Sequence, residues 1–346
     1  MKNILIFTFC LTFIILTIIS GNKAYSYSYS YGDEGLNIIL DIMGVAGNLE
    51  DSINHNEQEN NNKENHEHNE LKIGDNLKLR SIEITYKKYL FRNSYFFVNT
   101  VTAGKSIDIE QAYVNLPIAG ATLEIGKDFL MLSRLNQQHP HQWWFITPPI
   151  TFRAIIGEEG AKGINSKLSY TFPISQNFLL NTSFQKIWDN SWEKTKKNKP
   201  FISSLGLITE ISNGTLQVNY YKMFNPSFSW SVSAKYVKLL DFQENKQITL
   251  EGEFYKLADN NQGWWAGISK QLNRSWQIGT LIGNCSIIDT NLDKNNLNEY
   301  SLVIERRWGE FRKLKFQFIY NSNRKLALLV GYTQMFLLGG HPSHEF

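Results

Sequence analysis

The chain has 346 residues and a formal net charge of only +3 at pH 7, which argues against a nucleic-acid-binding protein. Its mean hydropathy of -0.31, with a single long apolar segment, excludes a bundle of membrane-spanning helices. Aromatic residues make up 14% of the chain, and barrels that cross a membrane place such residues in girdles at both interfaces.

The amino terminus predicts an export signal. Lys2 precedes an apolar run over residues 4–19, about 16 residues long and therefore short of the roughly 20 that a spanning helix needs. Small and polar residues follow, and we expect cleavage after Ala24. Residues 1–24 are thus interpreted as a signal peptide, with an uncleaved anchor helix as the alternative. Removal of Cys10 with the signal leaves Cys285 alone, so no intramolecular disulfide is expected.

Residues 25–76 are predicted to form an amino-terminal segment with one strand near residues 36–46. From residue 54 to 70 the sequence consists mainly of Asn, Glu, His and Lys, and such a stretch cannot bury enough apolar surface to become ordered. Its histidines and glutamates could bind a divalent metal weakly, and a solvated loop explains them equally well. The histidines in question are His55, His66 and His68.

Residues 77–338 are predicted to form a barrel, because apolar and polar residues alternate there with period 2. In residues 246–256, for example, Leu250 and Phe254 fall on one face and Glu251 and Glu253 on the other. Sixteen such segments are predicted over residues 36–46, 78–90, 93–102, 107–116, 120–129, 162–172, 178–188, 202–212, 213–224, 228–240, 246–257, 263–271, 275–288, 298–308, 312–322 and 325–338.

The length of these segments decides between a soluble and a membrane protein. Strands of soluble proteins average about 5 to 6 residues, whereas a strand that crosses a membrane needs roughly 9 to 11. The predicted fold class is therefore all-β, a transmembrane antiparallel up-and-down β-barrel of about sixteen strands, give or take two, without a plug domain. A soluble periplasmic β protein is the alternative.

Residues 339–346 form a predicted carboxy-terminal tail that ends in an aromatic residue, Phe346. In this respect the chain resembles outer-membrane barrels, whose terminal aromatic is read by the barrel assembly machinery. The expected location is the outer membrane of a Gram-negative-type bacterium. The expected partners are membrane lipid and, through Phe346, that machinery; the sequence leaves open whether the protein is a monomer or a homotrimer.

The histidine block His139-Pro140-His141 is the densest motif in the chain. Proline favours an extended backbone before it, so the two imidazoles could lie on one face and supply half of a zinc-like site. His341 and His344 could supply the rest if the tail folds back to the same rim. Zinc would bind neutral imidazoles, so we expect binding to weaken below about pH 6.5.

The alternative for the same block is a rigid loop. Its histidines would then hydrogen-bond to the backbone, while Trp143 and Trp144 would anchor the membrane interface.

The block also resembles a family of barrel proteins that are often labelled porin-like outer-membrane proteins or zinc-regulated TonB-dependent outer membrane receptors. The matching residues are Gly126-Lys127, Arg134-Leu135-Asn136, His139-Pro140-His141, Trp143, Phe145, Pro149, Gly157, Gly160 and the ending His341-Pro342, His344 and Phe346. This resemblance implies a barrel linked to zinc uptake. A TonB-dependent transporter needs 22 strands and a plug, for which the chain has too few residues.

The predicted polar strand faces carry both signs of charge, which is typical of a water-filled pore without strong ion preference. The predicted pore-lining residues are Lys235, Glu251, Glu253, Glu305, Arg307, Lys313 and Lys315.

Enzyme motifs are absent from the sequence, which has no Gly-x-Ser-x-Gly, phosphate-binding loop or His-Glu-x-x-His. We therefore expect no catalysis and no cofactor apart from a potential zinc ion. Two functions remain: a porin-like channel for small hydrophilic solutes, and a metal-binding receptor. A structural barrel without an open pore is a further alternative.

Overall fold

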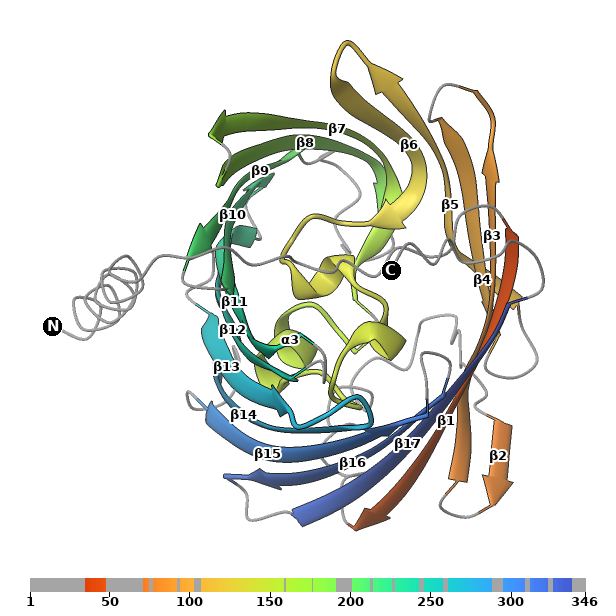
Figure 1. Cartoon of the computed structure of the whole chain (residues 1–346), viewed down its shortest axis with the longest axis vertical. Coiled ribbons are helices and arrows are strands. Elements are labelled where there is room, and N and C mark those ends of the chain that lie inside the picture. The colour runs from red at the N-terminus through yellow and green to blue at the C-terminus, as the bar shows by residue number, and fades with distance from the viewer. Residues whose placement is uncertain are drawn as a thin grey trace, which may run out of the picture.

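The computed structural model is a single antiparallel sheet that closes into a barrel around a folded segment (Figure 1). It describes residues 35–47, 71–74, 77–91, 94–102, 107–158, 160–175, 177–190, 201–211, 214–225, 228–242, 246–257, 261–287, 295–308, 312–322 and 326–337. The predicted signal peptide, the histidine-rich stretch with His55, His66 and His68, and the tail with His341, His344 and Phe346 all lie outside these ranges.

The sheet has seventeen strands. In chain order they are β1 (Gly35–Gly47), β2 (Leu71–Gly74), β3 (Leu77–Tyr89), β4 (Tyr95–Thr102), β5 (Ile107–Ile118), β6 (Ala121–Phe129), β7 (Lys162–Ser175), β8 (Phe178–Asn190), β9 (Phe201–Ile211), β10 (Gly214–Asn225), β11 (Phe228–Asp241), β12 (Lys246–Leu257), β13 (Gln262–Gln271), β14 (Trp276–Ile287), β15 (Asn295–Arg307), β16 (Arg312–Asn321) and β17 (Leu326–Leu337).

Sixteen of the strands close the barrel, as the alternation predicts. From β3 to β17 each strand pairs with its neighbour in sequence, and β1 completes the ring by pairing with both β17 and β3. β2 pairs only with the first residues of β3. The barrel therefore includes residues 35–47, which the sequence-based division placed in a separate amino-terminal segment.

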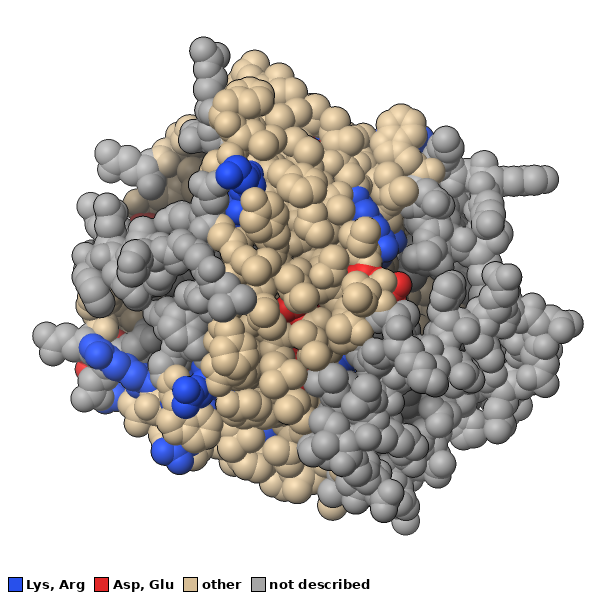
Figure 2. Space-filling view, turned by 90° about the vertical axis from the view of Figure 1, so that its right-hand side faces the viewer, with Lys and Arg blue, Asp and Glu red and all other residues tan. Residues whose placement is uncertain are grey.

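The wall of the barrel buries polar residues on its inner face and exposes apolar residues on its outer face, the reverse of a soluble protein. Inward positions are polar and buried, as in β12, where Thr249, Glu251 and Glu253 alternate with outward residues. Outward positions are apolar and exposed, for example Ile268 and Phe318. Figure 2 shows one side of the barrel, whose described surface is broad and largely uncharged. Exposed apolar surface on this scale is unfavourable in water and is typical of a barrel surrounded by lipid.

In the part of the chain that the structure describes, no helix combines the length and the apolar character needed to span a membrane.

Residues 130–161, which connect β6 to β7, fold back into the barrel, and we call this segment the lumenal loop (Figure 1). It contains two 3-10 turns, η2 (Leu135–Gln137) and η3 (Pro140–Gln142), and one short helix, α3 (Ile150–Ile155). Backbone polar groups inside a barrel need partners, and these turns together with side chains of the wall supply them.

Two irregularities in strand pairing add inward-pointing polar side chains. The β1–β3 register shifts so that Asp41 faces Ser81 and Ile42 faces Leu79, which leaves Arg80 without an opposing residue. The β4–β5 register shifts in the same way around Glu110. β-bulges of this kind re-aim a side chain, and here both Arg80 and Glu110 contact the lumenal loop instead of pointing outward.

Candidate functional site

The lumenal loop is built around its own apolar core. Side chains from the loop pack with inward residues of β8, β9, β10 and β12 to β15; the loop members are Leu130, Met131, Leu132, Leu135, Trp143, Phe145, Phe152, Ile155, Ile156 and Ala161. Burying a large apolar side chain contributes about 1.5 to 3 kcal/mol, so this core holds the loop firmly against the wall.

Glycines on the wall make room for the loop. A Cβ added at Gly267 would lie 3.0 Å from the Trp144 ring, and one at Gly279 would collide with the same ring. At Gly331 the added Cβ would come within 3.2 Å of Ile146.

Asn136 joins the two ends of the loop. Its Nδ2 donates to the carbonyls of Leu130, at 2.6 Å, and Ala161, at 3.0 Å, while its Oδ1 accepts from the Ala161 amide at 2.7 Å. Gly160 has φ +79°, and a Cβ there would lie 2.7 Å from Asn136 Oδ1. The Asn and Gly of the sequence motif therefore have a local structural role.

Polar side chains of the wall satisfy backbone groups of the loop. Gln317 Oε1 accepts from the amides of Ile146, at 2.7 Å, and Thr147, at 3.0 Å. Glu253 Oε1 accepts from the Leu135 amide at 2.8 Å, and Arg80 donates to the Ile146 carbonyl at 2.7 Å.

His139 and His141 lie side by side on the lumenal loop. Their rings are stacked, with centroids 5.3 Å apart and an interplanar angle of 22°. His139 has an extended backbone at φ -67° and ψ 146°, and Pro140 begins η3 directly after it. The prediction that both imidazoles share a face is therefore confirmed.

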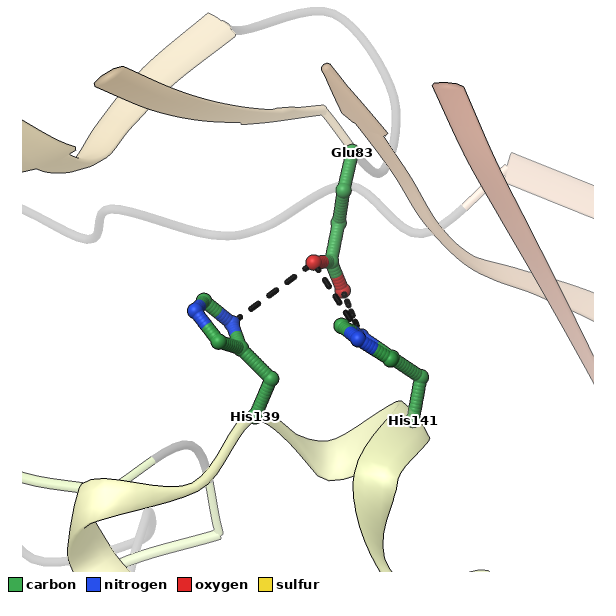
Figure 3. Close-up of side chains that lie close together, drawn as sticks. All are labelled: Glu83, His139 and His141. Carbon is green, nitrogen blue, oxygen red and sulfur yellow. Dashed lines mark hydrogen bonds and ion pairs between the residues drawn. The ribbon is translucent and has the colours of Figure 1, made fainter. Parts of the chain in front are cut away.

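Glu83 of β3 extends from the wall toward the two imidazoles (Figure 3). Its Oε2 lies 3.3 Å from His141 Nδ1 and 3.6 Å from His139 Nδ1. Glu110 of β5 approaches from a second strand, with Oε2 3.3 Å from His139 Nδ1. Glu83, His139 and His141 are each no more than 5% exposed. Potential ligand atoms of these three residues lie within 4.8 Å of one another, so the arrangement could hold a metal ion.

The second ring nitrogen of His139 is also held in place. His139 Nε2 lies 2.5 Å from Gln111 Oε1, and Gln111 Nε2 donates to Asp128 Oδ1 at 2.5 Å. Because Gln111 uses its amide N–H toward Asp128, its oxygen faces the imidazole as an acceptor. His139 Nε2 can therefore donate to Gln111 Oε1, while Nδ1 faces the carboxylates of Glu83 and Glu110.

The two histidines differ in basicity. Burial acts to lower the pKa of His139, but the hydrogen bond and charge of Glu110, together with the charge of Glu83, outweigh it and raise the pKa. Burial also lowers the pKa of His141, and there the charge of Glu83 offsets only part of the effect. Without a metal, His139 therefore holds a proton more tightly than His141 does.

Trp143 and Trp144 lie inside the barrel, so the prediction that they anchor the membrane interface is wrong. Trp143 is 3% exposed and contacts Phe145 and Phe152, and Trp144 Nε1 donates to Glu251 Oε1 at 2.5 Å. The physical reason is the apolar core of the loop, which is more favourably buried in the lumen than left at the rim.

The predicted pore-lining residues all lie on wall strands, at inward positions. Glu251 and Glu253 contact the loop directly, through Arg134 and the Leu135 amide. Glu305 pairs with Arg307 and lies 3.8 Å from Lys315, whose Nζ donates to the Trp143 carbonyl. Lys235 of β11 and Lys313 of β16 complete this set.

Glu83 and Glu110 were not among the predicted site residues. The alternation of β3 in the sequence indicates that Glu83 points inward. The sequence does not show which loop residue Glu83 faces. Glu110 belongs to a β-bulge, and strict alternation would have placed it outward.

No family model matches the chain. An uncharacterized protein of Aquifex aeolicus is 23% identical over 343 residues, covering 81% of this chain and 72% of that protein.

Among solved structures, OmpT, an outer membrane protein of Vibrio cholerae, superposes with a TM-score of 0.56 at 7% identity, covering 90% of this chain and 100% of that one. The anion-selective porin of Comamonas acidovorans gives 0.55 at 9% identity, covering 88% and 100%. OprB of Pseudomonas putida gives 0.54 at 9% identity, covering 88% and 94%. The chain thus has the fold of outer-membrane porins.

Proposed function

We propose that the protein is a porin-like channel of the outer membrane that admits small hydrophilic solutes past the lumenal loop. The observation that carries this proposal is the reversed burial of the wall, with polar residues inside and apolar residues outside. In a closed ring of this kind, the backbone N–H and C=O groups of each strand pair with those of its neighbours, as they must in lipid, and the ring encloses a polar interior. The porin fold of the structural neighbours supports the same function, and no catalytic role is proposed.

The partial exposure of inward basic side chains supports a water-filled passage beside the loop. Inward basic side chains keep measurable exposure, with Arg80 at 22%, Lys167 at 19% and Arg307 at 25%. Their acidic partners are more deeply buried, Asp41 at 8% and Glu305 at 1%. Because each of these cations lies near an acid, we expect at most a weak preference among small ions.

Channel recordings with substituted cysteines test this function. The parent should give stable single-channel steps in planar bilayers. A thiol reagent should leave these steps unchanged, because Cys285 is fully buried. In Arg80→Cys and Arg307→Cys, a bulky water-soluble thiol reagent should lower the conductance by blocking the remaining passage. Ile268→Cys, on the outward face, is the matched control and should conduct unchanged after the same treatment.

Absence of steps in a correctly folded parent would contradict the channel and favour a structural barrel. If the thiol reagent leaves the conductance steps of both Arg80→Cys and Arg307→Cys unchanged, the proposed passage is contradicted.

A metal-binding receptor is the second candidate function. The cluster of Glu83, His139 and His141 favours it, as does the resemblance of the histidine block to zinc-linked barrels. A receptor would have to release its ion, so zinc transport into vesicles containing the protein tests it directly.

A further inference from the structure

We propose that Glu83, His139 and His141, with Glu110 beside them, bind one divalent transition-metal ion as a resident clamp that ties the lumenal loop to β3 and β5. The clamp goes beyond the channel function and does not depend on it, because a barrel that conducts nothing could still contain the ion. It also differs from a receptor site, since the ion is part of the structure and is not cargo.

Three separations between ligand atoms match those around a small tetrahedral ion. Zinc lies about 2.0 to 2.1 Å from imidazole nitrogen and carboxylate oxygen, so neighbouring ligand atoms in a tetrahedron are roughly 3.3 Å apart. The observed separations are 3.3 Å for His141 Nδ1 to Glu83 Oε2, 3.3 Å for His139 Nδ1 to Glu110 Oε2 and 3.6 Å for His139 Nδ1 to Glu83 Oε2. Two imidazoles and two carboxylates are ligands that suit zinc and similar ions.

Glu83 provides a second, independent indication of a cation. The residue is 4% exposed, and among the described residues no group donates a hydrogen bond to its Oε2. A buried carboxylate oxygen is costly unless a positive charge or a donor faces it. Figure 3 shows this carboxylate directed between the two imidazoles, where an ion would satisfy it.

The surroundings of His139 are those of a metal ligand. A ligating histidine usually donates its other N–H to an oxygen that fixes the ring, and His139 Nε2 meets Gln111 Oε1 in this way. Asp128 in turn orients Gln111. Gln111 is therefore a positioning residue for the site.

The burial of the cluster explains why the ion would be resident. Structural zinc sites are closed by protein ligands, whereas sites that exchange a ligand keep an open position. Here the cluster is buried, and its ligands come from the lumenal loop and from two wall strands, β3 and β5. Binding therefore joins the loop to the wall.

Metal binding to the full-length protein, stripped with chelator and folded in detergent, tests the clamp. Titration calorimetry with Zn²⁺ should show one tight site per chain. X-ray absorption of the zinc-loaded parent should show two imidazoles and carboxylate oxygen, a readout that requires no variant. A parent that binds no zinc, or zinc ligated without imidazole, would overturn the proposal.

Variants locate the site. Glu83→Gln and His141→Gln should each weaken zinc binding by at least 100-fold, and Gln111→Leu by about 10- to 100-fold, as expected for an outer partner of a ligand. Glu253→Gln is the matched control and should bind zinc like the parent, because Glu253 holds the loop at the Leu135 amide and lies outside the histidine cluster.

A second control replaces the five other histidines, His55, His66, His68, His341 and His344, with alanine. This variant should retain the tight site. If it loses zinc while Glu83→Gln retains it, the metal is bound elsewhere and the clamp is excluded. Heat-modifiable migration on gels checks that each barrel is folded, and bilayer conductance, measured separately, reports on the channel.

Discussion

Arg134 of the lumenal loop forms an ion pair with Glu251 of β12 in the barrel interior, with side chains only 7% and 5% exposed. Glu251 also accepts from Trp144 Nε1, so one wall carboxylate contacts the loop at two places. Removing the partner of a buried charge costs about 3 to 5 kcal/mol, because the remaining charge stays desolvated. Opening of the loop would relieve this cost, while the strand pairings would keep the wall closed.

We therefore expect Arg134→Met to release the lumenal loop and leave the barrel folded. Limited proteolysis should cleave the loop of the variant much faster than that of the parent, with heat-modifiable migration unchanged. The double variant Arg134→Met with Glu251→Gln should be less susceptible than the single one, since no unpaired charge remains. Equal protection of parent and single variant would show that the pair does not hold the loop.

Gly279→Ala should displace Trp144. Overpacking of a filled interior costs about 1 to 3 kcal/mol, and the added Cβ would collide with the indole ring. The displacement should appear as a change in tryptophan fluorescence and a lower unfolding temperature. Gly283→Ala is the matched control, because its nearest neighbour is Ile150 Cγ2 at 3.4 Å, an ordinary contact. Identical behaviour of the two variants would contradict the close packing at Gly279.

Gln317→Leu should loosen the loop near Ile146. The substitution removes the acceptor of two buried amides, and each unsatisfied group costs about 1 to 3 kcal/mol. Hydrogen exchange at Ile146 and Thr147 should accelerate in the variant. Gln317→Glu retains an oxygen acceptor and should protect both backbone amides. Rapid exchange in this variant too would show that the Gln317 oxygen is not what protects them.

Ile268→Arg tests whether the outward face meets lipid. Ile268 is 47% exposed in the isolated chain, and an arginine on a lipid-facing position costs up to about 2 to 4 kcal/mol, depending on its depth in the bilayer. Folding into liposomes should therefore become measurably less favourable, whereas Ile268→Val should fold like the parent. A neutral effect of arginine would indicate that this face is in water.

Alternation was sufficient to predict the wall, because each inward or outward position follows from period 2. The predicted segment 228–240, for instance, corresponds to β11 at Phe228–Asp241. The bulges at Arg80 and Glu110 could not be predicted in this way, since an inserted residue breaks the period that the prediction uses.

The place of the lumenal loop was also beyond the sequence-based prediction. A loop at the rim would be polar, and the apolar run Leu130-Met131-Leu132 together with inward glycines such as Gly279 was a signal for a buried segment. Its partners on distant strands, such as Glu83 for His141, depend on barrel closure and have no local signature.

The pairing of β1 with β17 has a consequence for assembly. Asn37 lies opposite Leu337, so the seam joins the first and last barrel strands of the described chain. Until β17 has been synthesised, β1 and the growing end of the sheet are both open edges with unpaired N–H and C=O groups, and such edges promote association with other chains. The long-range closure is also entropically costly and slow. Both edges therefore stay unpaired until the final strand is in place, so the barrel closes only as the last step of its assembly.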